Sequence, residues 1–328
     1  RSFEESYVYY DDKNIFDGIY NREDFVFHLK PFEIDSLDNY TGEGLSFPGF
    51  FVSNIFPRLN DTLSLQDDYS LGFNHKTPID GFDIYSGKAK YYNDINLSQQ
   101  GLSGRGTLQY LTTNLISDSI SFFPDSVSII TDTFKIEPVF AGIEFPKVSN
   151  TKSYVHYEPY NDRLEAKVLS SPFSLYDNMI SLSGTILVQP SGLTGSGIAK
   201  LDQAQLNSNS FNFNAKWFGS DTTNLEVLSN GENIGLRANN LRSHIDLDQK
   251  SGVFYSNGED SFVDFPENKY RCYINTLSWD MISQKLNFGD STYTKFEFVS
   301  THPDQDSLSF FANQADYNFQ DYLIKVQG

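Results

Sequence analysis

The sequence predicts an all-β protein with negligible helix, an elongated array of tandem β units whose sheets stack or share edges in a solenoid- or sandwich-like way. Three observations predict this fold. Phenylalanine (29 residues) and tyrosine (20 residues) are abundant, and such aromatic residues suit half-buried strands. Short segments with alternating apolar residues are separated by turn-forming residues. A glycine-rich stretch also occurs twice, which indicates repeated structural units.

The N-terminal region, residues 1–81, is expected to hold short strands and long loops. Apolar residues occupy every second position of Phe25–Leu29, the period of a strand with one buried face. Clusters of Pro and Gly then surround short apolar segments at 45–47 and 50–52.

The repeated stretch is Gly101–Tyr110, which returns as Gly192–Leu201, 91 positions later. Its glycines are predicted to be structural turns or bulges of the repeat: Gly101, Gly104, Gly106, Gly192, Gly195 and Gly197. Other residues return at the same offset: Phe82, Tyr85, Ser117 and Phe122 reappear as Phe173, Tyr176, Ser208 and Phe213. We therefore expect residues 82–136 (the first repeat) and 173–227 (the second repeat) to superpose, with Gly104 and Gly195 at equivalent positions.

These patterns divide the chain into four predicted parts: 1–81, 82–172 with the first repeat and a linker, 173–230 with the second repeat, and 231–328. The linker is expected to contain a hairpin around Asn161 and Asp162. The polar tract 203–214 suits either a hydrogen-bonded ladder between stacked strands or a solvated strand face. In the last part, 276–282 and 313–319 are each expected to hold one helical turn at most.

Charge and hydropathy exclude several classes of partner. The formal net charge of -19 argues against binding to nucleic acid or to anionic lipid headgroups. No apolar run reaches the length of about 18 residues that a membrane helix needs, so direct membrane insertion is not expected. The lone Cys272 allows no intrachain disulfide and is predicted to be a small buried hydrophobe. The chain begins at Arg1 without a signal-peptide pattern, and we expect a processed chain or a fragment.

No motif for catalysis is present, and the sequence predicts no enzyme, no catalytic or metal-ligating residues and no cofactor. The glycine stretch is not expected to bind phosphate, because each copy leads into a strand rather than a helix. The histidines are scattered without metal-ligand spacing, and His156 lies on what reads as an aromatic strand face. Acidic pairs such as Asp11–Asp12, Asp67–Asp68 and Glu259–Asp260 read as solvated turns.

Short triplets of Asp, Ser or Thr, and a third residue that is aliphatic or Thr resemble the O-glycosylation sequon of exported Bacteroidota proteins. They begin at Asp35, Asp61, Asp118, Asp125, Asp221 and Asp306. The triplets favour an exported protein, although turns also favour Asp-Ser pairs.

Several longer sequence segments resemble those of very large, repetitive, all-β exported proteins of Bacteroidota. They are 31–39, 68–73, 122–126, 278–281 and 300–308. This resemblance implies a fragment of such a protein, located in the periplasm or at the outer membrane. It further implies a link to the type 9 secretion system, in which a plug protein closes the translocon pore. Residues 252–255 and 270–281 are similar to the OstA-like β-repeats of lipopolysaccharide-transport bridges.

The sequence therefore predicts a structural or interaction protein of the cell envelope that presents an acidic, polar β surface to a protein partner. The resemblance suggests an outer-membrane secretion channel as that partner. Two alternatives stay open. A carbohydrate-binding or glycoside-active protein would expose coplanar aromatic rings and hold two carboxylates about 5–10 Å apart in a cleft. A lipid conduit would have an apolar groove along the interior of its sheets.

Overall fold

The computed structural model describes residues 4–32, 45–229, 233–258, 261–289 and 295–327. Its regular structure consists of 29 β-strands and three single-turn 3-10 helices, η1 (Phe16–Gly18), η2 (Pro159–Asn161) and η3 (Pro303–Gln305). The predicted all-β fold with negligible helix is thus confirmed. Within the described ranges, no helix is long and apolar enough to span a membrane.

The chain forms two compact units. The first comprises Arg1–Ile136 and Asn150–Ser170, and the second comprises Glu137–Ser149 and Ser171–Gly328. The first repeat therefore lies in the first unit, and the second repeat lies in the second unit. Residues 150–170, expected to be part of a linker, return to the first unit as the predicted hairpin around Asn161. The four-part division of the chain stays a prediction.

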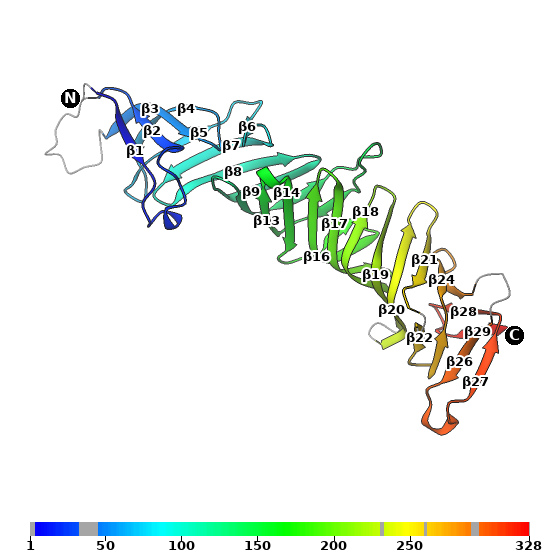
Figure 1. The fold of residues 1–328 in the computed structure, drawn as a ribbon. Helices are drawn as coiled ribbons and strands as arrows, with labels where there is room; N and C mark the ends of the chain where they lie inside the picture. Colours follow the sequence, from blue (N-terminus) through cyan, green and yellow to red (C-terminus); the bar gives the residue numbers. More distant parts are fainter. Residues whose placement is uncertain (1–3, 33–44, 230–232, 259–260, 290–294, 328) are drawn as a thin grey trace. The chain divides into compact units, whose positions relative to one another are not determined.

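The first unit is an antiparallel succession of strands (Figure 1). These strands are β1 (Ser6–Tyr9), β2 (Phe25–Leu29), β3 (Ser46–Ser53), β4 (Leu59–Leu65), β5 (Leu71–Lys76), β6 (Phe82–Ile84), β7 (Ala89–Ser98), β8 (Gly101–Tyr110), β9 (Thr113–Phe122), β10 (Val127–Ile130), β11 (Thr133–Ile136), β13 (Ser153–Glu158) and β14 (Arg163–Val168). Strands β1 to β5 pair in chain order, each with its neighbour in the sequence, and β5 also pairs with β7. The order continues through β8, β9, β10, β13 and β14.

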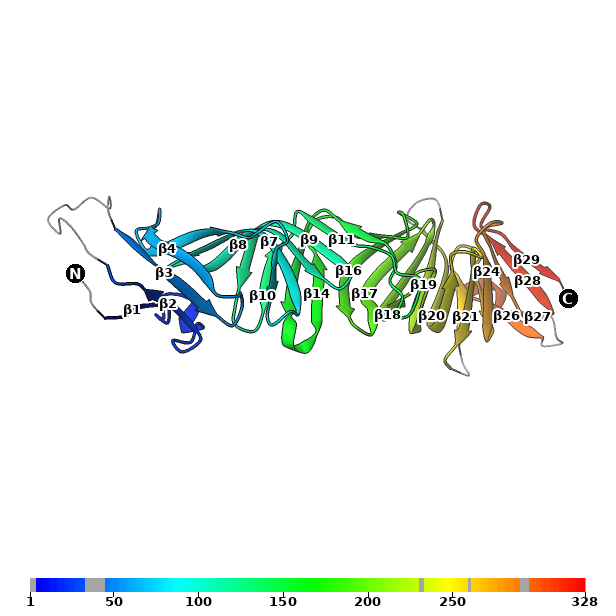
Figure 2. The ribbon, with the colours of Figure 1, turned by 90° about the horizontal axis from the view of Figure 1, so that it is seen from above.

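The second unit begins with the short strand β15, which pairs with β16, and continues as a meander of long strands, β16 to β20, that lie side by side (Figure 2). Its strands are β12 (Val148–Asn150), β15 (Phe173–Leu175), β16 (Ile180–Gln189), β17 (Gly192–Leu201), β18 (Ala204–Phe213), β19 (Trp217–Ser229), β20 (Asn233–Asp246), β21 (Ser251–Ser256), β22 (Phe262–Phe265), β23 (Tyr270–Tyr273), β24 (Thr276–Asp280), β25 (Lys285–Phe288), β26 (Phe296–Ser300), β27 (Ser309–Ala312), β28 (Gln314–Asn318) and β29 (Ile324–Gln327). After β20 the strands divide into two ladders, β21–β24–β25–β28–β29 and β22–β23–β26–β27. Successive hairpins therefore alternate between the two ladders.

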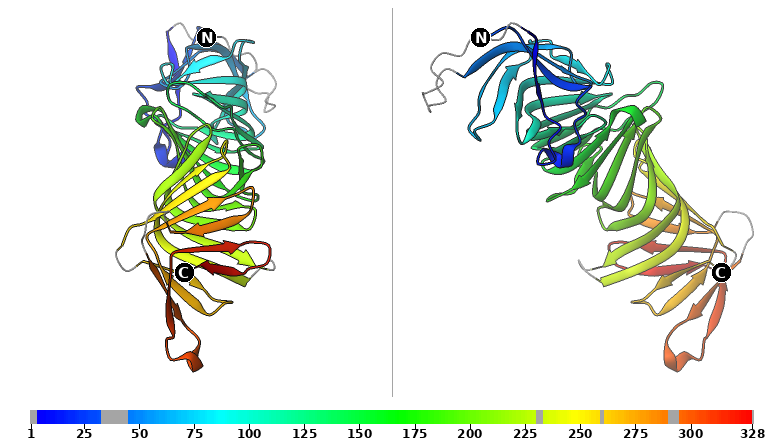
Figure 3. Two further views of the ribbon diagram at one scale, coloured as in Figure 1. Left: turned by 90° about the vertical axis from the view of Figure 1, so that its right-hand side faces the viewer. Right: turned by 60° about the vertical axis from the view of Figure 1, so that its left-hand side comes forward.

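The long strands pass from one ladder to another because their two halves pair with different neighbours. In β9, residues 113–116 pair with β11 and residues 119–122 pair with β10. In β20, residues 237–238 pair with β22 and residues 241–246 pair with β21. The curvature of these strands in the second unit is visible in Figure 3. A strand whose two halves pair with different neighbours needs an irregularity in its backbone between those halves.

That irregularity is a β-bulge, which inserts one residue and moves the following side chains to the other face. The register of β8 with β9 shifts between Gly104 and Gly106, and the register of β17 with β18 shifts between Gly195 and Gly197. On β9 the buried positions are accordingly 113, 115 and 117, followed by 120 and 122. The buried face is therefore continuous although the sequence alternation is interrupted.

Buried hydroxyl groups complete the hydrogen bonding at these bulges. The Ser117 hydroxyl accepts from the Ser119 N–H (2.8 Å) and donates to the Ile130 carbonyl (2.7 Å). Its counterpart Ser208 accepts from the Ser210 N–H (3.0 Å) and donates to the Thr222 carbonyl (2.8 Å). Because a bulge breaks the regular ladder, these hydroxyls satisfy main-chain groups that would otherwise be buried without partners.

The two repeats have the same strands at the same offset of 91 residues. The ranges of β6, β7, β8 and β9 correspond to those of β15, β16, β17 and β18. The corner tyrosines agree as well: Tyr85 donates to the carbonyls of Phe123 and Ser126, and Tyr176 donates to those of Asn214 and Trp217. The two repeats thus have the same strand ranges and the same corner hydrogen bonds.

Aromatic and aliphatic side chains fill the interior of each unit. In the first unit Phe56, Tyr91 and Phe122 are almost fully buried and meet with ring centroids 4.9–5.8 Å apart. In the second unit Phe213 and Phe218 stack at 5.8 Å. Such side chains supply most of the hydrophobic stabilisation, because burial of a large apolar side chain contributes about 1.5–3 kcal/mol.

Some elements differ from the expected ones. Residues 276–280 and 314–318, considered for single helical turns, are the strands β24 and β28. The long strand β20 was not expected, because a residue with positive φ, Asn240, interrupts its alternation. The polar tract 203–214 is mostly strand β18, with Leu206, Phe211 and Phe213 buried among outward-facing polar residues.

Candidate functional site

The glycines singled out by the repeat lie within strands β8 and β17 rather than in loops before them. Gly101 and Gly192 start these strands after two-residue turns and have φ values of +88° and +130°. Gly106 and Gly197 also have positive φ, and a Cβ at either would lie 2.0 Å from the Tyr92 carbonyl or 2.2 Å from the Ser183 carbonyl. These glycines permit close approach of neighbouring strands. No helix follows either motif, so neither has the helix N-terminus of a phosphate-binding loop.

The bulge beside the first glycine motif brings charged side chains together on the outer face of the first unit. Between the pairs Gly104–Ile120 and Gly106–Ser117, the single residue Arg105 faces two residues of β9, Asp118 and Ser119. The Arg105 guanidinium consequently lies 3.4 Å from the Asp118 carboxylate. The bulge therefore sets the position of this ion pair.

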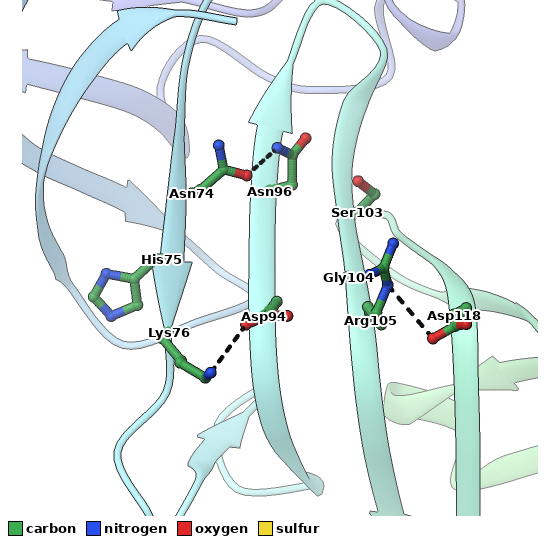
Figure 4. Close-up of a pocket in the computed structure, with 9 residues that line it drawn as sticks. All are labelled: Asn74, His75, Lys76, Asp94, Asn96, Ser103, Gly104, Arg105 and Asp118. Carbon is green, nitrogen blue, oxygen red and sulfur yellow. Dashed lines mark hydrogen bonds and ion pairs between the residues drawn. The ribbon is translucent and has the colours of Figure 1, made fainter. Parts of the chain in front are cut away.

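A second ion pair continues the row across the neighbouring strands. Asp94 on β7 is directly opposite Arg105 on one side and Lys76 of β5 on the other. The Lys76 Nζ lies 4.0 Å from the Asp94 carboxylate. Lys76, Asp94, Arg105 and Asp118 thus form a row with alternating positive and negative charge, which we call the charge row (Figure 4).

Amide and hydroxyl side chains border the charge row. The Asn96 amide donates to the Asn74 side chain (2.5 Å), and the Asn74 amide donates to Gln66 (2.9 Å). Ser103 is opposite Asn96 on the next strand. This second row of polar groups offers both donors and acceptors next to the charges.

Together the two rows line a shallow cavity of about 480 Å³ on the outer face. Its lining residues are Asn74, His75, Lys76, Asp94, Asn96, Ser103, Gly104, Arg105 and Asp118 (Figure 4). The ring of His75 is engaged elsewhere: Nδ1 lies 2.7 Å from the Asp61 carboxylate, and the ring stacks against Phe82. None of the lining residues is Phe, Tyr or Trp, so the cavity has no aromatic platform for a sugar ring.

Three of the four positions of the charge row lack a charge at the offset of 91, whereas Lys76 corresponds to Lys167. Asp94, Arg105 and Asp118 correspond to Thr185, Ser196 and Asn209 at the offset of 91. Thr185 is directly opposite Ser196, as Asp94 is opposite Arg105, and the same bulge lies beside them. The bent β structure therefore forms without the charge row, and the charges are not a requirement of the fold.

Other candidates read from the sequence are structural. The thiol of Cys272 is buried, and burial raises its pKa to about 12. Trp279 is buried against Phe319, while Trp217 packs against His244. His156 lies 3.9 Å from Glu158 on the outer face of β13. Across the described ranges, no three His, Cys, Asp or Glu side chains gather closely enough to hold a metal ion.

The acidic pairs and the Asp-Ser/Thr triplets lie mainly on the surface. Asp11 pairs with Arg22 at 2.9 Å, and Asp68 accepts from Ser70 in a turn. Two triplets, 118–120 and 221–223, occupy bulges where a buried serine precedes them, which gives these a structural explanation. Three further triplets begin at Asp61, Asp125 and Asp306. Their hydroxyl residues, Thr62, Ser126 and Ser307, are not buried. The pair Glu259–Asp260 and the triplet at Asp35 lie outside the described residues.

Sequence reasoning did not identify the charge row, because its members are far apart in the chain and become neighbours only through strand register. One signal was available: Asp94, Arg105 and Asp118 are among the positions at which the charge differs between the two repeats. A comparison of the outward-facing positions of the repeats would have drawn attention to these residues.

No known protein family, no curated protein and no solved structure matches this chain.

Proposed function

We propose that this chain is a non-enzymatic structural and interaction protein whose first unit binds a protein partner through its outer face. One observation carries the proposal: the two repeats have the same strands and corner hydrogen bonds, but Asp94, Arg105 and Asp118 of the charge row occur only in the first. Surface charges that the fold does not need are available for recognition.

We place this function in the cell envelope, with an outer-membrane secretion channel as the partner, because of the resemblance to exported Bacteroidota proteins. A role as a subunit or plug of the type 9 translocon is the specific form of this proposal. The high negative charge favours solubility and steers association with a partner of complementary surface.

The two alternative functions receive less support. The charged cavity of the first unit has no Phe, Tyr or Trp in its lining and Trp279 is buried, which disfavours a carbohydrate site at either place. A lipid conduit needs an open apolar interior, whereas the interior side chains described above are packed against one another at very low exposure.

The proposal is tested by a photo-crosslinking residue placed at Ser121, on the outer face of β9, in the native host. We expect capture of one defined envelope protein, together with altered secretion or envelope integrity when the gene is deleted. The same residue at Ser283, in an exposed turn of the second unit, serves as the control. Failure to capture a protein from the outer face, with an unchanged secretome and envelope, would contradict the proposal.

A further inference from the structure

We propose that the charge row binds an extended segment of the partner whose acidic and basic side chains alternate along one face. This inference rests on the function proposed above and names the chemistry of the partner at one site. The ligand is a mixed-charge peptide segment, and its contacts are side chain to side chain.

The first argument is the sign pattern. Lys76, Asp94 and Arg105 occupy directly opposed positions on three neighbouring strands, and Asp118 follows on the fourth. Neighbouring strands lie about 4.8 Å apart, so the sign of the charge changes at each step of that length. A ligand with a single sign of charge would meet a repelling group at every second step. Same-face side chains of an extended segment lie about 6.7 Å apart, so the long Lys and Glu side chains of an alternating ligand take up the difference in spacing to reach an attracting group at each step.

The second argument is that the resident ion pairs are easily exchanged. The side chains of Arg105 and Asp118 are 66% and 79% exposed, and those of Lys76 and Asp94 are 75% and 49% exposed. Exposed pairs of this kind contribute about 0–1 kcal/mol to stability. A partner can therefore replace one member of each pair at little cost.

The third argument comes from the second repeat. The same backbone, with the same bulge, holds Thr185, Ser196 and Asn209 at the corresponding positions. If the charges served only the bulge, the second repeat would be expected to keep them. The bulge therefore does not require Asp94, Arg105 and Asp118, and their charges are available for an intermolecular contact.

The proposal is tested with a variant that copies the second repeat, Asp94→Thr, Arg105→Ser and Asp118→Asn in the full chain. The probes are labelled peptides of about ten residues whose outward side chains are alternating Glu and Lys, and peptides of the same composition with Glu and Lys in separate blocks. Fluorescence anisotropy is measured at about 0.05 M and about 0.3 M salt, which changes the screening length.

We expect the alternating peptide to bind the natural chain at least about tenfold more tightly than the blocked peptide and to weaken with salt. The triple variant should lose this preference while keeping its unfolding midpoint. The reverse graft, Thr185→Asp, Ser196→Arg and Asn209→Asp, should add a second site for the alternating peptide and double its stoichiometry.

Three results would overturn the proposal: equal binding of the alternating and blocked peptides, no binding of either, or unchanged binding by the triple variant. An all-lysine peptide provides a check on general attraction to this acidic chain, and its binding should be the same for the natural chain and the triple variant. If crosslinking at Ser121 still captures a partner while the peptide preference is absent, the proposed function stands and this site is wrong.

Discussion

The corner tyrosines show how single side chains hold each repeat together. Tyr85 is fully buried, and its hydroxyl lies 2.7 Å from the Phe123 carbonyl and 2.9 Å from the Ser126 carbonyl. Tyr176 makes the equivalent contacts at 2.9 and 3.0 Å. Each hydroxyl links the turn after the first short strand of the repeat to the turn after its last long hairpin strand. One polar atom thus satisfies two carbonyl groups and fixes the ring within an apolar core.

Removal of either corner hydroxyl should therefore destabilise the unit that contains it. Tyr85→Phe and Tyr176→Phe each remove the hydroxyl donor from two part-buried carbonyls, and we expect a loss of about 1–3 kcal/mol in the free energy of unfolding. The Ser126 and Trp217 carbonyls still accept from the main-chain N–H groups of Phe123 and Asn214. Urea denaturation followed by tyrosine fluorescence measures the change. Tyr160→Phe, at a half-exposed ring, is the matched control and should have no measurable effect. Equal stability of Tyr85→Phe and the natural chain would show that the corner contacts contribute nothing.

Buried tyrosines also predict a loss of stability in alkali. Burial raises the pKa of Tyr20 and that of Tyr110 to about 12, while the unfolded side chains titrate near about 10. Below the unfolded value both states are protonated and the contribution to stability is fully present. As the pH rises above it, the unfolded state loses protons first, so the free energy of unfolding falls until the folded pKa is reached.

Phenolate absorbance during a pH titration checks this prediction. The buried tyrosines should ionise in a late step together with loss of the β circular dichroism signal. Ionisation of all tyrosines in one early step with the fold intact would contradict it.

At the scale of elements, the bulged long strand is the recurring structural device. β9 and β18 each have five buried positions, with a phase change after the third, and a buried serine lies at the change in both. β19 and β20 have the same kind of register irregularity in their pairing. Gly106 of β8 and Gly197 of β17 pair next to the bulge of one neighbouring strand, and a Cβ at either would meet a carbonyl of the other neighbouring strand, β7 or β16. The bulge, the glycines of the neighbouring strand and the buried serine therefore together allow one strand to pair in two ladders.

The glycines opposite the bulge should accordingly tolerate no side chain. Gly106→Ala and Gly197→Ala place a Cβ against a neighbouring carbonyl at a backbone conformation that L residues rarely adopt. We expect each to lower the free energy of unfolding by about 2–4 kcal/mol, as strain at a special backbone position does. Ser196→Ala, between the two glycines of the second repeat, is the control and should change stability by less than about 0.5 kcal/mol. Denaturant unfolding would exclude this role for the glycines if the alanine variants matched the control.

At the scale of the whole molecule, two units are built by the same construction, and most of the described chain takes part in antiparallel ladders. Consecutive hairpins alternate between two ladders after β20, so both ladders grow with the chain. Residues 137–149 belong to the second unit and 150–170 to the first, so the chain crosses between the units more than once. A chain truncated after residue 136 would consequently lack residues 150–170, which belong to the first unit.

Cys272 provides a reporter of this architecture. Its thiol is fully buried on β23, and burial raises its pKa to about 12, so the reactive thiolate is scarce in the folded protein. We expect Ellman's reagent to modify Cys272 only as the second unit unfolds, with a rate that rises with denaturant. Rapid and complete modification of the native protein would show that the interior around β23 is open.

Sequence alone determined the strand-rich fold class, the internal repeat and the glycines that mark it, because these follow from composition, period-two alternation and similarity at a fixed offset. The buried corner tyrosines were also visible as repeated residues. The tertiary structure decided which half of each long strand joins which ladder, because a bulge breaks the alternation from which strands are read. It also decided that Lys76, Asp94, Arg105 and Asp118 form one row, since neighbours across a sheet are set by register and not by distance along the chain.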